Sequence, residues 1–218
     1  MNYDSVPLRD FKELNDWETV IFVYQSALKQ VETKIDILNG EFQHRHKYNP
    51  IEHVKSRIKT PESIVKKLKR HGYESSIENM VRYVNDIAGI RISCSFTSDI
   101  YLIADMISKQ NDLTILARRD YMKNPKKSGY RSYQMLVTTP VFLSDSIIDT
   151  KVEIQIRTVA QDFWATLEHK MHYKFEGDGP DYITKELREC ARYVAELDTR
   201  MEELNNEIQK YGKLSDKK

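Results

Sequence analysis

Apolar residues recur every three or four positions over residues 16–42, which is the spacing of one face of an α-helix. The recurring positions are Val20, Tyr24, Ala27, Leu28, Val31, Ile35, Leu38 and Phe42. The pattern predicts an amphipathic helix whose apolar stripe packs against the rest of the protein. We place it in an N-terminal helical arm, residues 1–47.

The period changes to two over residues 53–59, which predicts a β-strand. One side of this strand would be basic and would carry His53, Lys55, Arg57 and Lys59. The other side would carry Val54, Ser56 and Ile58. A strand of this kind presents a row of cations on one face of a sheet.

Capping residues mark the starts of the helices that follow. Thr60 is a favourable N-cap and Pro61 suits the first helical position, so a helix should begin there. A second short helix is expected after Ser75, with Glu78 in a capping box. A third is expected after a Ser98 cap, over residues 98–110.

Further segments that alternate in the manner of strands are residues 86–96, 113–119, 130–139 and 150–158. The apolar side of the first would hold Ile90, Ile92, Cys94 and Phe96. The polar side of the last would hold Glu153, Gln155 and Arg157, and a helix follows over residues 159–175. Strands that alternate with helices predict an α/β or α+β domain with a mixed β-sheet flanked by helices, which we assign to residues 48–175.

The last helix should begin near Asp181, within a C-terminal helix and polar tail, residues 176–218. Apolar residues seven apart are followed three positions later by a second apolar series, which is an a/d seam. The two series are Leu187, Val194, Met201 and Ile208, and Cys190, Leu197, Leu204 and Tyr211. The seam is equally compatible with a helix that packs on its own domain and with a helix that takes part in self-association.

Composition excludes several classes of protein. The chain has 218 residues and 40% hydrophobic residues, enough for a substantial core. It has no apolar run of the roughly 20 residues that span a bilayer, and its polar start does not resemble a signal peptide, so we expect a cytoplasmic protein. With Cys94 and Cys190 alone, a disulfide framework or four-thiolate zinc site is excluded, and we expect two buried thiols.

Charge is balanced overall but concentrated locally. The formal net charge of +1 argues against binding of duplex nucleic acid through bulk electrostatics. Residues 55–70 nevertheless carry seven cations against Glu62, with Ser63 and Lys67 one turn apart, and residues 118–131 hold a second basic patch. Two separate basic patches require two anionic partners or one long one.

The polar faces of the predicted strands collect cations together with two carboxylates on separate elements, Asp86 and Glu153. Such a pair beside Lys and Arg suits Mg²⁺ that bridges phosphate oxygens, because magnesium takes one or two carboxylates and completes its shell with water and phosphate. The alternative is a set of solvated residues on an exposed sheet face.

Other chemistry has weaker support. The sequence contains neither a Walker A loop nor a GxGxxG motif. His169 and His172 lie near Glu168, but the HExxH order is missing, which favours structural or solvent-facing histidines. The segment PKKSGYRSYQ, residues 125–134, suits either a phosphate-gripping loop whose tyrosine stacks on a base or a solvated basic hairpin.

Three motifs in this order resemble the synthetase domain of the RelA/SpoT family: VNDIAGIRI, RDYMKNPKKSGYRSYQ and VEIQIRTVAQDFWATLEHK. The resemblance runs from about Tyr48 to Lys174, and the short chain is similar to the small alarmone synthetases, particularly the RelP type. It implies transfer of pyrophosphate from ATP to the 3′-hydroxyl of GDP or GTP, giving ppGpp or pppGpp and AMP. It also implies a homotetramer.

Roles for individual residues follow from the same resemblance. Asp86 and Glu153 would hold Mg²⁺, and Glu153 would also face the attacking hydroxyl as the candidate base. The ATP site would comprise Arg57 and Arg91 around adenine, with Lys59, Ser63 and Lys67 on the phosphates. The GTP/GDP site would comprise Lys126, Tyr130, Gln134, Gln155 and Asp162, with Tyr130 stacked on guanine.

The sequence departs from the family pattern at two of these positions. Gln134 stands where histidine is common, and glutamine can donate and accept hydrogen bonds but cannot carry charge. Asp162 stands where asparagine is common, and its carboxylate could accept from the guanine N1 and N2 donors. The sequence contains no His-Asp dipeptide of the family's hydrolase, so we expect a synthetase only. The alternative function is a non-catalytic nucleotide- or RNA-binding regulator that uses the same basic face.

Overall fold

The computed structural model describes residues 16–46, 48–174 and 181–215. The polar start of the chain, the side chain of His172 and the end of the polar tail lie outside the described residues. The core is a five-stranded sheet in the order β1-β2-β5-β4-β3. Its strands are β1 (Ile51–Ile58), β2 (Ala88–Cys94), β3 (Thr114–Asp120), β4 (Tyr133–Phe142) and β5 (Ile147–Thr158).

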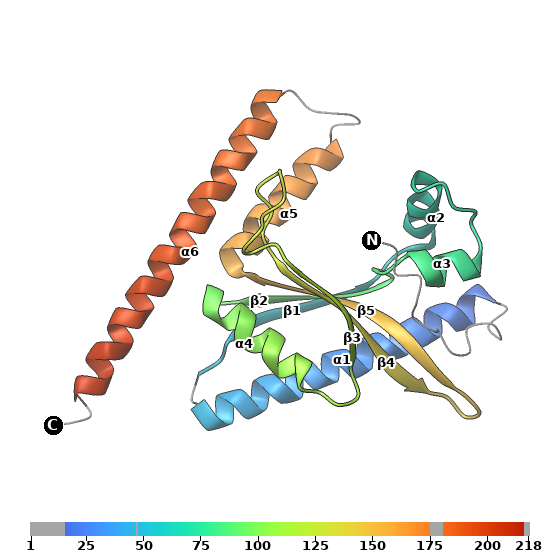
Figure 1. Ribbon diagram of the computed structural model, residues 1–218, viewed down its shortest axis with the longest axis horizontal. Helices are drawn as coiled ribbons and strands as arrows, with labels where there is room; N and C mark the ends of the chain where they lie inside the picture. The colour runs from blue at the N-terminus through green and yellow to red at the C-terminus, as the bar shows by residue number, and fades with distance from the viewer. Residues whose placement is uncertain (1–15, 47, 175–180, 216–218) are drawn as a thin grey trace.

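Strands β2 and β5 pair in parallel, and the other neighbours pair antiparallel. The predicted mixed sheet in an α+β fold is confirmed. The helices are α1 (Trp17–His46), α2 (Pro61–Arg70), α3 (Ile77–Tyr83), α4 (Thr97–Ser108), α5 (Val159–Lys174) and α6 (Asp181–Ser215). Figure 1 shows α1 across one face of the sheet, α2 and α3 at one end of the opposite face, and α5 with the long α6 at its other end.

The two faces of the sheet differ because side chains alternate along each strand. Apolar side chains of β2 and β5 meet the buried stripe of α1 in one core, in which Val20, Tyr24 and Val31 are fully buried. The predicted stripe of the first helix is therefore confirmed. The division into an arm, a central domain and a C-terminal segment stays a prediction.

The opposite face is polar, and the strand register determines which residues meet there. Arg57 of β1 lies opposite Gly89 of β2, which in turn lies opposite Glu153 of β5. One step along, Arg91 pairs with Gln155, and Gln155 also pairs with Gln134 of β4. Four strands thus contribute polar side chains to one surface.

The helix starts are partly as predicted. Oγ1 of Thr60 accepts a hydrogen bond from the Ser63 amide at 3.4 Å and caps α2, as expected. Helix α3 begins at Ile77, and the capping side chain is Ser76, whose Oγ accepts from the Asn79 amide at 3.2 Å. The expected cap at Ser75 and capping box with Glu78 are therefore wrong, by one position.

Helix α4 differs from the prediction for a related reason. It begins at Thr97, and Oδ2 of Asp99 accepts from the Phe96 amide at 3.0 Å, so the expected Ser98 cap is wrong. The chain leaves the sheet after Cys94, and Phe96 precedes α4 in place of extending the apolar side of β2. The side-chain hydrogen bond at this helix start therefore runs from the Phe96 amide to a carboxylate in the first turn.

The two cysteines lie in different environments. Cys94 is buried in β2, as predicted, whereas Cys190 is exposed on α6, so the expectation of a buried thiol there is wrong. Both thiols are free. None of the helices in the described part of the chain combines the length and apolar character needed to cross a membrane.

The heptad seam of α6 is only partly used within the protomer. Val194 packs against a small apolar cluster, but Leu197 is 54% exposed. The other exposed residues of the seam are Cys190, Met201, Leu204, Ile208 and Tyr211. The fully packed positions of α6 are instead Ala191 and Asp198, because a small side chain and a hydrogen-bonded carboxylate allow a close approach to α5 and β5.

Candidate active site

A cavity of about 230 Å³ opens on the polar face of the sheet. Its lining includes residues that the sequence assigned to separate elements, namely Arg57, Asp86, Arg91, Glu153 and Gln155. Both predicted metal carboxylates and both arginines expected around adenine therefore border one space. The strand register explains this, since Arg57 and Glu153 are each paired with Gly89, which has no side chain to separate them.

Asp86 lies just before β2 and is held by two lysines. Lys59 Nζ lies 2.9 Å from Asp86 Oδ2, and Lys67 Nζ of α2 lies 2.7 Å from Oδ1. Burial raises the pKa of Asp86, but the hydrogen bonds and charges of Lys67 and Lys59 outweigh it and hold this pKa below its usual value. The carboxylate is therefore ionised near neutral pH, between two cations that can also reach phosphate.

Ser63 lies one turn before Lys67 on α2 and is exposed. Its Oγ accepts a hydrogen bond from the Thr60 hydroxyl at 3.0 Å. It does not border the cavity lined by Asp86 and Glu153. Of the three residues expected on the donor phosphates, the structure thus brings Lys59 and Lys67 to Asp86 and leaves Ser63 at the edge.

Glu153 lies between the two predicted substrate regions. Its Oε2 accepts a hydrogen bond from Gln155 Nε2 at 2.7 Å, within the cavity that contains Asp86. On its other side, Glu153 borders a smaller cavity of about 30 Å³ together with Arg119 and Gln134. Glu153 therefore borders both cavities, which is the position that a base between donor and acceptor would have to occupy.

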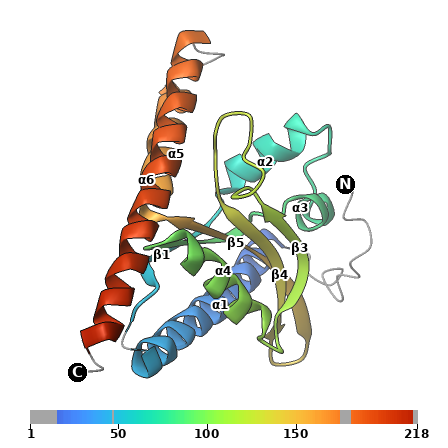
Figure 2. The ribbon, with the colours of Figure 1, turned by 60° about the vertical axis from the view of Figure 1, so that its left-hand side comes forward.

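The loop between β3 and β4 brings the predicted acceptor residues together. Tyr130 Oη accepts hydrogen bonds from Arg157 Nη2 at 2.9 Å and from Gln134 Nε2 at 3.2 Å. Lys126 Nζ lies 4.7 Å from the centre of the Tyr130 ring, in cation–π contact. Figure 2 shows this loop rising from the face of the sheet that carries α2 and α5.

Arg157 links the two regions and is a residue whose role the sequence did not indicate. It is 3% exposed and donates to Gln155 Oε1 at 2.6 Å as well as to Tyr130. Burial lowers the pKa of Arg157, and its buried Nε has no hydrogen-bond partner among the described residues. The sequence feature that could have identified Arg157 as a site residue is its position on the polar side of β5, two residues after Gln155.

Asp162 and Arg91 were assigned to different substrates but contact each other. Asp162 Oδ1 lies 3.3 Å from Arg91 Nη1 and 3.4 Å from Arg157 Nη1. The predicted adenine and guanine regions therefore share a boundary at Asp162. A hydrogen-bonded series runs from Glu153 through Gln155 and Arg157 to Tyr130.

Lys151 is a second residue that the sequence prediction missed. Its ammonium is buried and donates to the carbonyl oxygens of Val81 and Arg82 and to Asn85 Oδ1, at 2.9 to 3.0 Å. Burial lowers the pKa of Lys151 to about 8. Lys151 therefore ties the end of α3, just before Asp86, to the strand that carries Glu153. The signal was its position on the same side of β5 as Glu153.

Comparisons with known proteins show which family the chain resembles. A family model described as a region found in RelA/SpoT proteins matches residues 56–178. The chain is 44% identical to the GTP pyrophosphokinase YwaC of Bacillus subtilis, over 89% of this chain and 93% of the relative.

Solved structures give the same result. The crystal structure of small alarmone synthetase 2 from Bacillus subtilis has a TM-score of 0.80 and 42% identity, over 88% of this chain and 99% of that one. Small alarmone synthetase 1 from the same organism, bound to its product pppGpp, has a TM-score of 0.82 and 34% identity, over 88% and 98% of the two chains. Its AMPCPP complex has a TM-score of 0.76 and 31% identity, over 89% and 98%. The chain therefore belongs to the RelA/SpoT family, among its small alarmone synthetases.

Proposed function

We propose that the protein is a GTP pyrophosphokinase that transfers the β,γ-pyrophosphoryl group of ATP to the ribose 3′-hydroxyl of GDP or GTP. The hydroxyl oxygen attacks the β-phosphorus of ATP, the bond from that phosphorus to the α-phosphate oxygen breaks, and AMP leaves. The products are ppGpp or pppGpp. The observation that carries this proposal is the position of Glu153, which borders both the cavity with Asp86, Arg57 and Arg91 and the cavity with Gln134.

On the donor side, Arg57 and Arg91 would stack on the two faces of adenine. The Arg side chain suits this role because its planar guanidinium can stack on a ring while its edge stays hydrated. Lys59, Lys67 and Ser63 would bind the phosphates. Both lysines are within 2.9 Å of Asp86 in this structure, so phosphate binding would place them between two anionic groups.

On the acceptor side, Tyr130 would stack on guanine and Lys126 would approach the phosphates. Asp162 would accept from the guanine ring, and Gln134 and Gln155 would donate to the sugar and phosphate groups. Glu153 would take the proton of the 3′-hydroxyl as that oxygen attacks. The relative that was crystallised with pppGpp and with AMPCPP, an ATP analogue, supports both nucleotide assignments.

Asp86 and Glu153 would hold Mg²⁺. The residues fit this ion because both carboxylates border one cavity, with Lys59 and Lys67 beside Asp86, and magnesium needs one or two carboxylates when phosphates supply other ligands. Bound Mg²⁺ would neutralise charge on the phosphate oxygens. The protein's own residues would orient the nucleotides and accept the proton.

The alternative, a non-catalytic regulator, is not favoured. Two carboxylates facing a polyphosphate site would repel the ligand unless a metal were present, and a pure binding protein gains nothing from them. The relatives are, in addition, named as pyrophosphokinases.

The direct test is incubation of the purified protein with ATP and GDP or GTP, with and without Mg²⁺, followed by chromatography of the nucleotides. We expect AMP and ppGpp or pppGpp in equal amounts, and no product after chelation of the metal. Tight binding of both nucleotides without AMP formation would favour the regulator. We place this activity in the cytoplasm, where both substrates are available.

We also propose that the protein forms a homotetramer and that the exposed seam of α6 is one of its interfaces. Replacing Leu197 and Leu204 with Lys should lower the mass measured by light scattering, because charged side chains would be buried at the interface. The protomer should remain folded, since both side chains are exposed in it. Thr199→Lys, on another face of the helix, is the control. An unchanged mass in the double variant would show that another surface assembles the oligomer.

A further inference from the structure

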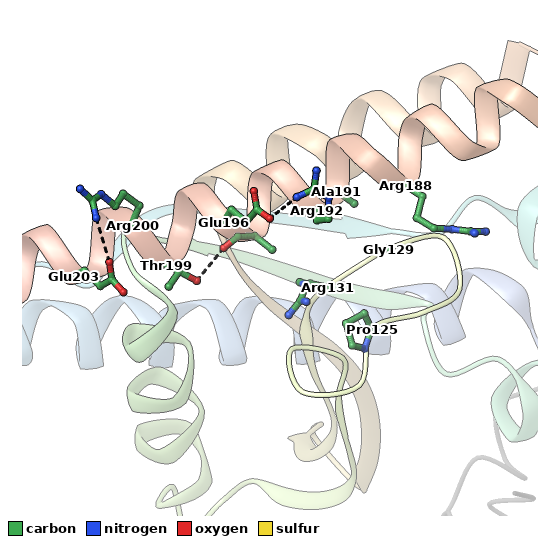
Figure 3. A pocket seen from close by; sticks show the side chains of 11 residues that line it. Pro125, Gly129, Arg131, Arg188, Ala191, Arg192, Glu196, Thr199, Arg200 and Glu203 are labelled. Carbon is green, nitrogen blue, oxygen red and sulfur yellow. Dashed lines mark hydrogen bonds and ion pairs between the residues drawn. The ribbon is translucent and has the colours of Figure 1, made fainter.

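The tip of the acceptor loop lies against α6 at Gly129. Gly129 has a φ of +91°, a backbone conformation that other residues adopt only at a cost. A Cβ at this position would lie 2.6 Å from the Cβ of Ala191 and 3.8 Å from the carbonyl oxygen of Arg188. Glycine is therefore required for two independent reasons, the backbone conformation and the absence of space. Figure 3 shows the loop turning past α6 at this contact.

The contact is narrow because a cavity of about 530 Å³ separates the loop from α6 beside it. This cavity is bordered by Pro125 and Arg131 of the loop and by Arg192 and Thr199 of α6 (Figure 3). A shift of α6 at position 191 would therefore be transmitted to the loop through Gly129.

Hydrogen bonds fix α6 on both sides of Ala191. One turn earlier, Trp164 Nε1 of α5 donates to the Leu187 carbonyl oxygen at 3.0 Å. Two turns later, Asp198 Oδ2 accepts from Thr158 Oγ1 and Gln161 Nε2, each at 2.8 Å. These donors lie on α5 and at the end of β5, next to Arg157. The strand that carries the acceptor network thus also fixes the helix that supports the loop.

An apolar cluster completes this arrangement. Trp164 and Ala165 of α5 pack with Ala191, and the Tyr130 ring packs against the same cluster. Tyr130 is consequently oriented from one side by Arg157 and Gln134 and from another by α5 and α6.

We propose that Ala191 is a positioning residue for the acceptor site. Gly129 packs on the methyl group of Ala191, and this contact holds Tyr130 and Lys126 in the position that binds the guanine nucleotide. Ala191 acts through the loop, with no contact to substrate. The proposal rests on the proposed function of the loop.

The experiment compares GDP and AMPCPP affinity, measured by calorimetry, in Gly129→Ala and in Gly129→Ala/Ala191→Gly. We expect the single variant to lose about tenfold in GDP affinity, from backbone strain and overlap together. AMPCPP affinity should stay within about twofold, because Arg57 and Lys67 lie elsewhere. The second substitution should restore at least about threefold, because it removes the overlapping methyl group and leaves the backbone strain.

Two controls isolate the contact. Gly129→Ala/Ala195→Gly places a glycine one turn further along α6, at the same cost in helix stability, but keeps the overlapping methyl group of Ala191. It should therefore restore no GDP affinity. Gly72→Ala has a φ of +78° but no atom within 4 Å of the added Cβ, so its thermal stability reports strain alone.

The outcomes separate the two proposals. Unchanged GDP affinity in Gly129→Ala, or equal affinity in the two double variants, would overturn the role of Ala191. A wild-type protein that binds GDP but makes no product would overturn the proposed function, while the affinity comparison would still decide the role of Ala191.

Discussion

The donor side of the site is built from regular elements, with Arg57 on β1, Arg91 on β2 and Lys67 on α2, whereas the acceptor side depends on a loop. Lys59 and Lys67 reach Asp86 from neighbouring parts of the fold. The acceptor loop is held in position by contacts with β5, α5 and α6. At one of these contacts, Gly129 and Ala191 are 62 residues apart in the sequence.

The difference shows that two kinds of information specify the two sides. Local periodicity places a donor residue on a face of a strand or helix, and pairing of strands then brings those faces together. The loop has no period, so its conformation depends on long-range packing of Tyr130 and Gly129. Substitutions should accordingly act through charge on the donor side and through shape on the acceptor side.

The largest effect is expected at the centre that both sides share. Asp86→Asn and Glu153→Gln should each lower kcat by roughly a hundredfold or more, because a carboxylate that holds a metal or takes a proton contributes several kcal/mol. Steady-state kinetics with both substrates measures this, and thermal unfolding verifies the fold. Glu62→Gln, an exposed carboxylate in the first turn of α2, is the control and should remain active. A near-normal kcat in either variant would show that the substituted carboxylate is not part of the catalytic centre.

A second substitution tests the framework behind the donor side. Lys151→Met keeps the length of the side chain but leaves the Val81 and Arg82 carbonyl oxygens and Asn85 without their donor. We expect a loss of about 2 kcal/mol in the free energy of unfolding, the cost of unsatisfied buried groups, together with lower kcat as Asp86 shifts.

Urea denaturation and kinetics on the same samples measure both quantities for Lys151→Met. Lys109→Met is the control, because Lys109 at the end of α4 is exposed and forms a surface ion pair with Asp105, one turn earlier. It should change stability by less than about 0.5 kcal/mol. Equal stability of the two variants would show that Lys151 does not hold this segment.

The sequence predicted the sheet, the helices and the polar face because each depends on periodic patterns. It also placed Arg57, Arg91, Asp86 and Glu153 on elements that do meet in one cavity. The caps expected at Ser75 and Ser98 were wrong, because several neighbouring serine and aspartate side chains near a helix start can each accept a hydrogen bond from a backbone amide there.

Three features of the site could not be predicted from local patterns. The three acceptors of Lys151 come from another part of the chain, and Arg157 donates a hydrogen bond to Tyr130 of the loop between β3 and β4. The requirement for glycine at position 129 arises partly from Ala191 on a helix that follows much later. Each depends on contacts between distant segments, which periodicity does not encode.

The last comparison separates the two sides by nucleotide affinity. Arg57→Ala should weaken AMPCPP by about 1 to 2 kcal/mol through lost stacking and leave GDP unchanged, whereas Tyr130→Ala should do the reverse, by about 1 to 3 kcal/mol. Calorimetry with each nucleotide measures both. Tyr130→Phe keeps the ring but loses the bonds to Arg157 and Gln134, and it separates stacking from hydrogen bonding.

Substitution of Asp162 extends this comparison, because Arg91 and Asp162 contact each other, 3.3 Å apart, at the boundary between the predicted adenine and guanine regions. Asp162→Ala should relax the preference for guanine over hypoxanthine, since the N2 donor loses its acceptor, and it should also weaken AMPCPP by freeing Arg91. For Arg57→Ala, the control for the loss of positive charge is Arg118→Ala, because Arg118 is hydrogen-bonded to Ser108 on the other side of the sheet. If Tyr130→Ala weakened AMPCPP alone, the loop would serve the donor, and the two sides would have to be exchanged.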